Sequence, residues 1–195
     1  MSYKLGLYIY IRNSIKVDAM KQILPILTLT TLTAAAFADA GAAAPAAASG
    51  LSYNNISVSY NQLSASGISG HINGWSLTAT AAIGNSNVIV QGQTSVGGDL
   101  GNGNDTVLIG YVFKNPAADV IVAVGSNEFY GVRLRKDLGS NFEGSVSYAR
   151  NSGDNQYGLS VGYNFTKQVS FDLSYAKIDT DVSVTQWTAG LRYNF

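Results

Sequence analysis

The sequence predicts an all-β protein, a single antiparallel up-and-down transmembrane β-barrel of about ten strands, with eight strands as the alternative count. Three observations support this fold class. Apolar and polar residues alternate with period two in one segment after another from Leu51 onward. The connections between these segments alternate between short turns and longer polar loops. Charged residues make up only 12% of the chain, about half the usual share for a soluble domain.

The first 40 residues predict an export signal in front of the barrel. Met20 opens a short positive segment, and residues 23–33 form an apolar stretch of secretory length that is too short for a confident membrane anchor. Small residues at the end of this region fit cleavage after Ala38 or Ala40. The export signal implies that the mature protein lies outside the cytoplasm.

The chain is therefore divided into four expected parts. They are a mis-annotated upstream extension (1–19), a secretory signal peptide (20–40), an Ala/Pro-rich periplasmic lead-in (41–50) and the barrel (51–195). An extended signal remains the alternative for the first part.

The first five predicted strands each carry an apolar face that alternates with Ser, Thr, Asn, Gln or Gly. They span 54–60 (Ile56, Val58, Tyr60), 74–83 (Trp75, Leu77, Ala79, Ala81, Ile83), 87–96 (Val88, Val90), 106–113 (Val107, Ile109, Tyr111, Phe113) and 119–125 (Val120, Val122, Val124).

The other five predicted strands follow the same pattern, and charges begin to enter their polar faces. They span 129–136 (Tyr130, Val132, Leu134), 142–148 (Phe142, Val146, Tyr148), 157–165 (Tyr157, Leu159, Val161, Tyr163, Phe165), 169–175 (Val169, Phe171, Leu173, Tyr175) and 186–195 (Trp187, Ala189, Leu191, Tyr193, Phe195).

The connections predict the orientation of the barrel. Outer-membrane barrels have short periplasmic turns and longer outside loops, so both termini are expected in the periplasm. The remaining outside loops are short, which predicts a barrel that barely protrudes. The expected turns are 84–86, 114–118, 137–141 and 166–168, and the longer loops are 61–73 and 97–105.

Charge placement favours a barrel surrounded by lipid over a secreted or periplasmic β-domain. The apolar faces carry almost no charge, and an Arg or Lys on a lipid-facing surface costs about 2–4 kcal/mol at mid-depth. Aromatic pairs near strand ends fit an interfacial girdle. The charges of the opposite phase are expected to form a lumen network, either a salt-bridge network that fills the barrel or a constriction that selects small ions. The network residues are Arg133, Arg135, Glu143, Asp172 and Arg192.

The last five residues, from Leu191 to Phe195, resemble the terminal signature of outer-membrane β-barrel proteins. That resemblance implies that Tyr193 and Phe195 are an assembly signal recognised by the barrel assembly machinery. The stretch from Leu51 to Phe195 is similar in size and texture to OmpX-like proteins and the OmpA transmembrane domain. The expected location is the bacterial outer membrane, with outer-membrane lipid as a partner.

No sequence feature indicates chemistry. The absence of cysteine excludes disulfides and Cys-based zinc sites, and the absence of a Lys/Arg cluster gives no indication of nucleic-acid binding. Residues 101–108 look like a calcium-binding repeat of the RTX type, but as a single copy they predict an ordinary loop. The one histidine, His71, lies near Ser69 without an evident carboxylate to orient it.

We therefore expect a structural or surface barrel, without enzymatic activity and without a cofactor. The alternative is a narrow passive pore for ions or very small solutes, because inward glycines leave some room whereas about ten strands cannot form a porin-width channel.

Overall fold

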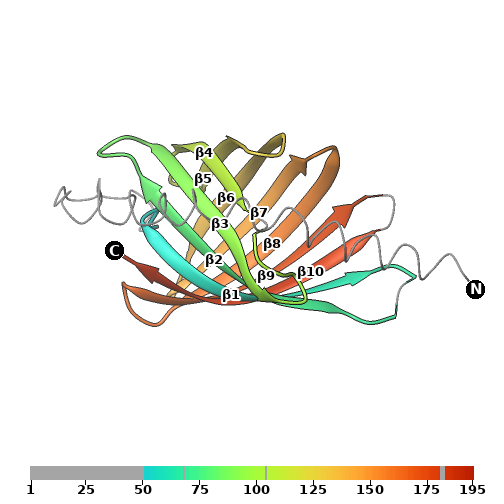
Figure 1. Ribbon diagram of the computed structural model, residues 1–195. Helices are drawn as coiled ribbons and strands as arrows, with labels where there is room; N and C mark the ends of the chain where they lie inside the picture. The colour runs from blue at the N-terminus through green and yellow to red at the C-terminus, as the bar shows by residue number, and fades with distance from the viewer. Residues whose placement is uncertain (1–50, 68, 104, 181–182) are drawn as a thin grey trace, which may run out of the picture.

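The structure, a computed structural model, describes residues 51–195 apart from residues 68, 104, 181 and 182. In this part the chain forms ten strands that pair antiparallel with their sequence neighbours and close into a barrel (Figure 1). Ten strands are confirmed and eight are excluded. The strands are β1 (Asn55–Ala65), β2 (Ile72–Ala82), β3 (Val88–Gly98), β4 (Thr106–Phe113), β5 (Asp119–Gly125), β6 (Phe129–Gly139), β7 (Phe142–Asn151), β8 (Asp154–Asn164), β9 (Val169–Asp179) and β10 (Val184–Asn194).

The pairing of β10 with β1 closes the sheet along the full length of both strands. It runs from Asn55 opposite Asn194 to Ala65 opposite Val184, and the Phe195 amide donates a hydrogen bond of 3.0 Å to the Asn54 carbonyl. Closure leaves no open strand edge, which a bilayer interior could not satisfy. We call the end at which β1 begins and β10 ends the periplasmic end, following the orientation predicted above.

The strands are tilted relative to the barrel axis. A row of residues that pair from strand to strand begins at Trp187, the fourth residue of β10, and ends at Phe113, the last residue of β4 at the periplasmic end. A line perpendicular to the strands therefore moves toward the periplasmic end as it follows the barrel wall. A closed barrel requires this tilt and stagger. The row contains Trp187, Tyr175, Leu159, Val146, Leu134, Val120 and Phe113.

Large apolar side chains face outward and polar side chains face the lumen. On β8, Leu159 and Val161 are 59% and 50% exposed, whereas Ser160 between them turns inward and shares a 2.7 Å hydrogen bond with Ser145. The alternation of faces is therefore confirmed. Such a surface is suited to a bilayer, because the apolar side chains that face outward would contact lipid chains instead of water.

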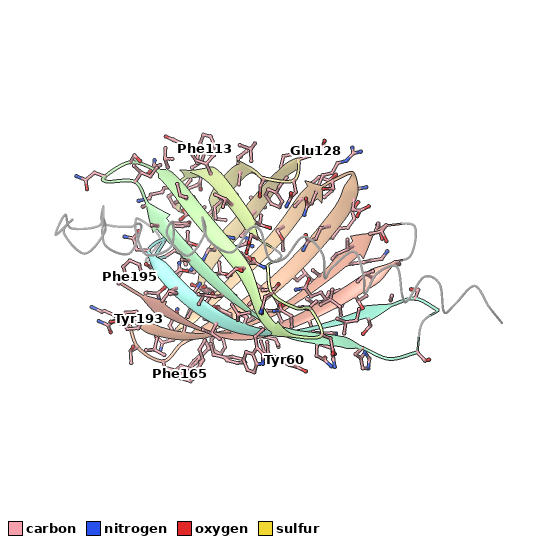
Figure 2. The ribbon with its side chains drawn as sticks, viewed as in Figure 1. Tyr60, Phe113, Glu128, Phe165, Tyr193 and Phe195 are labelled. Atoms are coloured by element: carbon pink, nitrogen blue, oxygen red, sulfur yellow. The ribbon has the colours of Figure 1, made fainter. Side chains whose placement is uncertain are left out.

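Aromatic residues form two belts on the outer face. One belt lies at the periplasmic end and consists of aromatic residues near strand ends; Figure 2 shows Phe165, Tyr193 and Phe195 projecting from the barrel wall. A second belt, which the sequence analysis did not identify, lies toward the other end. It contains Tyr60, Trp75, Tyr148, Tyr157, Tyr175 and Trp187, which pack as three pairs with ring centroids 5.0–5.4 Å apart. Two belts delimit an apolar band, as in membrane barrels.

The expected loop over residues 61–73 is too long, because β1 continues to Ala65 and β2 begins at Ile72. β1 and β2 continue pairing past the aromatic belt, with Gln62 opposite Asn73 and Leu63 opposite Ile72. Beyond the lipid a strand needs no apolar face, so the period-two pattern stops while the backbone pairing continues. This hairpin extends beyond its neighbours (Figure 1), and the barrel protrudes more than expected.

The β6–β7 connection is also tighter than the expected turn over residues 137–141. Only Ser140 and Asn141 remain outside the strands, with φ angles of 51° and 69°, and the register shifts between Asp137 and Gly139. Two residues with positive φ match the twist of a hairpin. Within the described residues, the chain contains no helix that is both long and apolar enough to span a membrane.

Candidate functional site at the periplasmic end of the lumen

Four of the five charges of the expected lumen network lie together at the periplasmic end of the barrel: Arg135, Glu143, Asp172 and Arg192. Arg135 on β6 donates to both carboxylate oxygens of Glu143 on β7, at 2.9 and 2.8 Å. Arg192 on β10 donates to Oε1 of the same carboxylate at 2.5 Å. Glu143 thus bridges two guanidinium groups, and all three side chains are at most 10% exposed.

Asp172 on β9 lies at the edge of this cluster. Its Oδ1 is 3.5 Å from Arg192 Nη2, and its side chain remains 32% exposed. Because it is longer and more hydrated, this ion pair is weaker than the two made by Glu143.

Gly162 on β8 explains how side chains from flanking strands meet. A Cβ at Gly162 would lie 2.7 Å from Asp172 Oδ1 and 2.8 Å from Glu143 Cγ. The two acidic side chains therefore lean into the space that the glycine leaves. Gly158 and Gly190 are similarly covered, by the hydroxyls of Ser147 and Ser59. The inward glycines were expected to leave room in the lumen, but at these positions neighbouring side chains occupy that room.

Arg133 does not join the cluster. It faces the lumen one step further from the periplasmic end than Arg135, and it lies opposite Ser147 in the register rather than opposite Glu143. In the described part of the chain it forms no hydrogen bond or ion pair, and its side chain is exposed. Arg133 therefore faces the lumen without facing Glu143 across the β6–β7 hairpin.

The segment before β1 enters the same end of the lumen. Leu51 is only 5% exposed, and the Tyr53 hydroxyl donates a 2.6 Å hydrogen bond to Asp119 at the start of β5. Tyr53 also packs against an apolar cluster that β3, β4 and β5 contribute to the interior. The cluster consists of Ile89, Val112 and Ile121.

Arg135 joins this segment to the charged cluster. Its Nη1 donates to the Ser52 carbonyl at 2.8 Å, and its guanidinium carbon lies 5.3 Å from the centre of the Tyr53 ring. A cation above an aromatic face is attracted by the ring quadrupole. Residues 51–54, which we call the entry segment, are thus held from the β3–β5 side and from the β6–β10 side.

The electrostatics of Tyr53 follow from this burial. Burial raises the pKa of the Tyr53 phenol, and the hydrogen bond to the Asp119 carboxylate raises it further. The phenol therefore remains protonated at neutral pH, which keeps its hydrogen available to Asp119.

Uncharged hydrogen bonds fill other parts of the interior. Asn61 on β1, 3% exposed, donates to Ser76 at 2.9 Å and accepts from Thr188 at 2.9 Å. At the periplasmic end, Ser170 donates to Asn164 and accepts from Asn194 at 3.2 Å. The Asn61 contacts link β1 to β2 and β10, and the Ser170 contacts link β9 to β8 and β10.

The remaining sequence candidates do not form a site. His71 lies in the exposed β1–β2 connection, where its Nδ1 is 2.8 Å from the Ser64 hydroxyl. Just before the segment that resembles a calcium-binding repeat, Asp99 accepts a hydrogen bond of 3.3 Å from the Asn73 backbone amide. No group of three metal-ligating side chains occurs among the described residues.

A closed antiparallel barrel with an apolar belted exterior and a polar, hydrogen-bonded interior defines a transmembrane β-barrel. The family model for the outer membrane protein beta-barrel domain matches residues 24–195. The chain belongs to this family and is a protein of the bacterial outer membrane. The resemblance stated from the C-terminal residues is confirmed at this level.

Solved structures with a similar fold include three outer-membrane proteins. The KdgM porin is 14% identical, with a TM-score of 0.44 over 71% of this chain and 99% of that one. Neisserial surface protein A is 16% identical, with a TM-score of 0.39 over 74% and 98%. Ail, the attachment invasion locus protein of Yersinia pestis, is 19% identical, with a TM-score of 0.34 over 73% and 97%. A search of curated proteins gives no significant match.

Proposed function

We propose that this protein is a structural barrel of the outer membrane, without enzymatic activity, whose lumen is closed at the periplasmic end. The observation that carries the proposal is the position of the entry segment. Tyr53 and Ser52 are held by Asp119 and Arg135 at the mouth through which a solute would leave. A lumen of ten strands is narrow, so side chains and a short segment are enough to block it.

The charged cluster supports the same role. Glu143 pairs with both Arg135 and Arg192 rather than facing an open channel. A buried carboxylate that bridges two guanidinium groups rigidifies the barrel wall. The interior therefore contributes stability and a unique packing. Most of the polar side chains in this cluster bond to one another, although Arg192 Nε has no hydrogen-bond partner among the described residues.

A narrow pore for small ions is the second candidate. Arg133 favours it, because this cation faces the lumen, is exposed, and has no hydrogen bond or ion pair in the described part of the chain. Under this alternative the entry segment would leave the mouth during conduction.

Planar-bilayer recording separates the two candidates. The outer-membrane form of the wild-type protein should give no reproducible unitary steps. Tyr53→Ala removes the ring and the hydrogen bond to Asp119, so it should produce steps or open-channel noise. Tyr111→Ala, on the lipid face, is the matched control and should remain silent. Steps of constant size from the wild-type protein would reject the closed barrel in favour of the pore.

Assembly is expected to depend on the C-terminal strand. We propose that Tyr193 and Phe195 present the signal that the barrel assembly machinery recognises. Both rings are outward and exposed, at 50% and 59%, on the strand that closes the barrel.

A further inference from the structure

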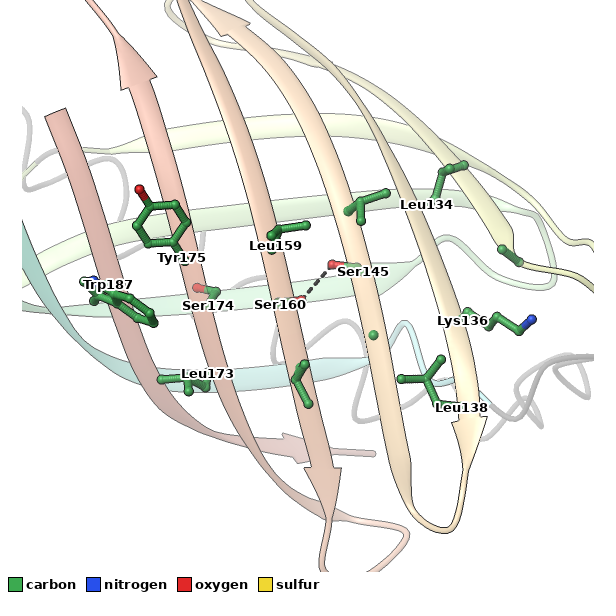
Figure 3. Close-up of a pocket in the computed structure, with 14 residues that line it drawn as sticks. Leu134, Lys136, Leu138, Ser145, Leu159, Ser160, Leu173, Ser174, Tyr175 and Trp187 are labelled. Atoms are coloured by element: carbon green, nitrogen blue, oxygen red, sulfur yellow. Dashed lines mark hydrogen bonds between the residues drawn. The ribbon is translucent and has the colours of Figure 1, made fainter. Parts of the chain in front are cut away.

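An apolar groove crosses the outer face of the barrel over β6 to β10 (Figure 3). Its volume is about 520 Å³. Leucines, Val146 and Val161 line its length, with Tyr175 and Trp187 at the end that belongs to the second aromatic belt. The groove lies on the lipid-facing side, so the molecules available to fill it are the lipids of the outer membrane.

The depth of the groove comes from residue size along two neighbouring rows of the sheet. One row has Tyr175, Leu159 and Val146, and the next has Leu173, Val161 and Gly144. The residues between the rows turn inward, as Ser145 and Ser160 do when they bond to each other in the interior. They leave only backbone on the outer floor of the groove.

Gly144 deepens the groove at its lower end. It is an outward-facing position without a side chain, between bulky neighbours. A Cβ at Gly144 would lie 3.1 Å from Leu138 Cδ1, so a larger residue would fill this part of the groove.

Lys136 supplies a charge at the same end. It pairs with Gly144 in the register, faces outward, and is exposed. In the described part of the chain it forms no ion pair, and the apolar groove beside it offers no carboxylate. Lys136 lies close to the β6–β7 turn at the periplasmic end, and its amine points away from the leucines of the groove (Figure 3). A lysine in this position extends its amine to the membrane interface while its stem stays in the apolar layer.

We propose that this groove is a binding site for one phospholipid of the periplasmic leaflet. An acyl chain lies along the leucines from Lys136 toward Tyr175, and the lipid phosphate pairs with the Lys136 amine. The chemistry is complementary at both ends, since the groove is apolar and the cation stands at the leaflet's phosphate level. The proposal depends on membrane insertion and is independent of whether the lumen conducts.

Lipid retention tests the proposal. The folded protein is extracted in mild detergent, exchanged into detergent containing phosphatidylglycerol, and weighed by native mass spectrometry. The wild type should carry one phospholipid, and Lys136→Gln should reduce the retained fraction by about tenfold, the effect of losing one charge-assisted contact. Lys114→Gln, which removes a cation at the same end outside the groove, is the matched control and should retain the lipid.

A second variant addresses the acyl chain. Gly144→Leu fills the lower groove and should also lose the lipid, with heat-modifiable migration on a gel checking that the barrel is folded. A wild type without bound lipid would overturn the proposal. Equal retention by Lys136→Gln and the wild type, or by a folded Gly144→Leu and the wild type, would overturn it as well. If Gly144→Leu does not fold, the comparison of lipid retention between Lys136→Gln and the wild type tests the proposal by itself.

Discussion

Replacing Glu143 by Gln should destabilise the barrel more than any other single change in the lumen cluster. The carboxylate accepts hydrogen bonds from both Arg135 and Arg192, and its side chain is only 9% exposed. A neutral amide leaves the buried Arg135 guanidinium without the counter-charge of Glu143 and leaves Arg192 with only its longer pair to Asp172. Breaking a buried pair by removing one partner costs about 3–5 kcal/mol. Arg135 keeps its bond to the Ser52 carbonyl, so we expect the lower part of that range.

Asp172→Asn is the matched control for this prediction. Asp172 carries the same charge in the same cluster, but it is 3.5 Å from Arg192 and 32% exposed. Hydrated ion pairs contribute about 0–1 kcal/mol, so its replacement should cost no more than about 1 kcal/mol. The assay is urea-dependent folding into liposomes, with the free energy of unfolding compared among the variants.

A double substitution separates charge from packing. Arg192→Gln removes one of the two cations that lose Glu143 and should partly restore stability to Glu143→Gln, since the two sites are coupled. The reasoning is refuted if Glu143→Gln and Asp172→Asn unfold at the same urea concentration. It is also refuted if Arg192→Gln makes the Glu143 variant worse.

Three further predictions concern the lipid face, closure and the entry segment. Leu173→Arg should cost about 2–4 kcal/mol of folding free energy in liposomes, because Leu173 faces outward, and a cost near zero would contradict that facing. Deleting Phe195 should reduce the outer-membrane yield far more than deleting Ser69 from the exposed β1–β2 connection, and equal yields would argue against the closure model. Because the pKa of Tyr53 is raised in the folded barrel, the protonated phenol stabilises the closed mouth fully at pH values below the ordinary tyrosine pKa of about 10. This stabilisation is lost progressively as the pH rises above that value. Bilayer conductance should therefore appear only at strongly alkaline pH, and Tyr53→Phe should remove that pH dependence.

Alternation made the membrane-spanning part of the fold predictable from the sequence. Inside the bilayer every second residue must be apolar, so strands such as β8 carry a strong period-two signal from Tyr157 to Tyr163. Above the lipid that requirement ends. Residues 61–73 therefore looked like a loop in the sequence, although β1 and β2 continue to pair as far as Leu63 opposite Ile72.

The period-two pattern indicates which charged residues share the polar face of the strands, but it does not indicate which of them contact one another. Phase alone placed Arg133, Arg135 and Glu143 in the lumen. Which arginine reaches Glu143 depends on register and tilt, and these set Arg135 beside it and Arg133 opposite Ser147.

The entry segment was not predictable as part of the site. Leu51 to Tyr53 is too short to show a periodic pattern, and its partner Asp119 is 66 residues away from Tyr53 along the chain. The one usable signal was the pair of large residues, Leu51 and Tyr53, directly after an Ala-rich stretch. A flexible lead-in that packs against nothing does not require large side chains, so this pair indicates a packed segment.

Quenching of tryptophan fluorescence by brominated lipids tests most directly whether the apolar face of this barrel lies against lipid. The protein has two tryptophans, and both Trp75 and Trp187 face outward in the second aromatic belt, at 48% and 49% exposure. After folding into liposomes, lipids brominated near the headgroup should quench most of the emission, and lipids brominated at the chain terminus should quench less. Emission that neither lipid quenches would contradict the membrane barrel and place both tryptophans away from the bilayer.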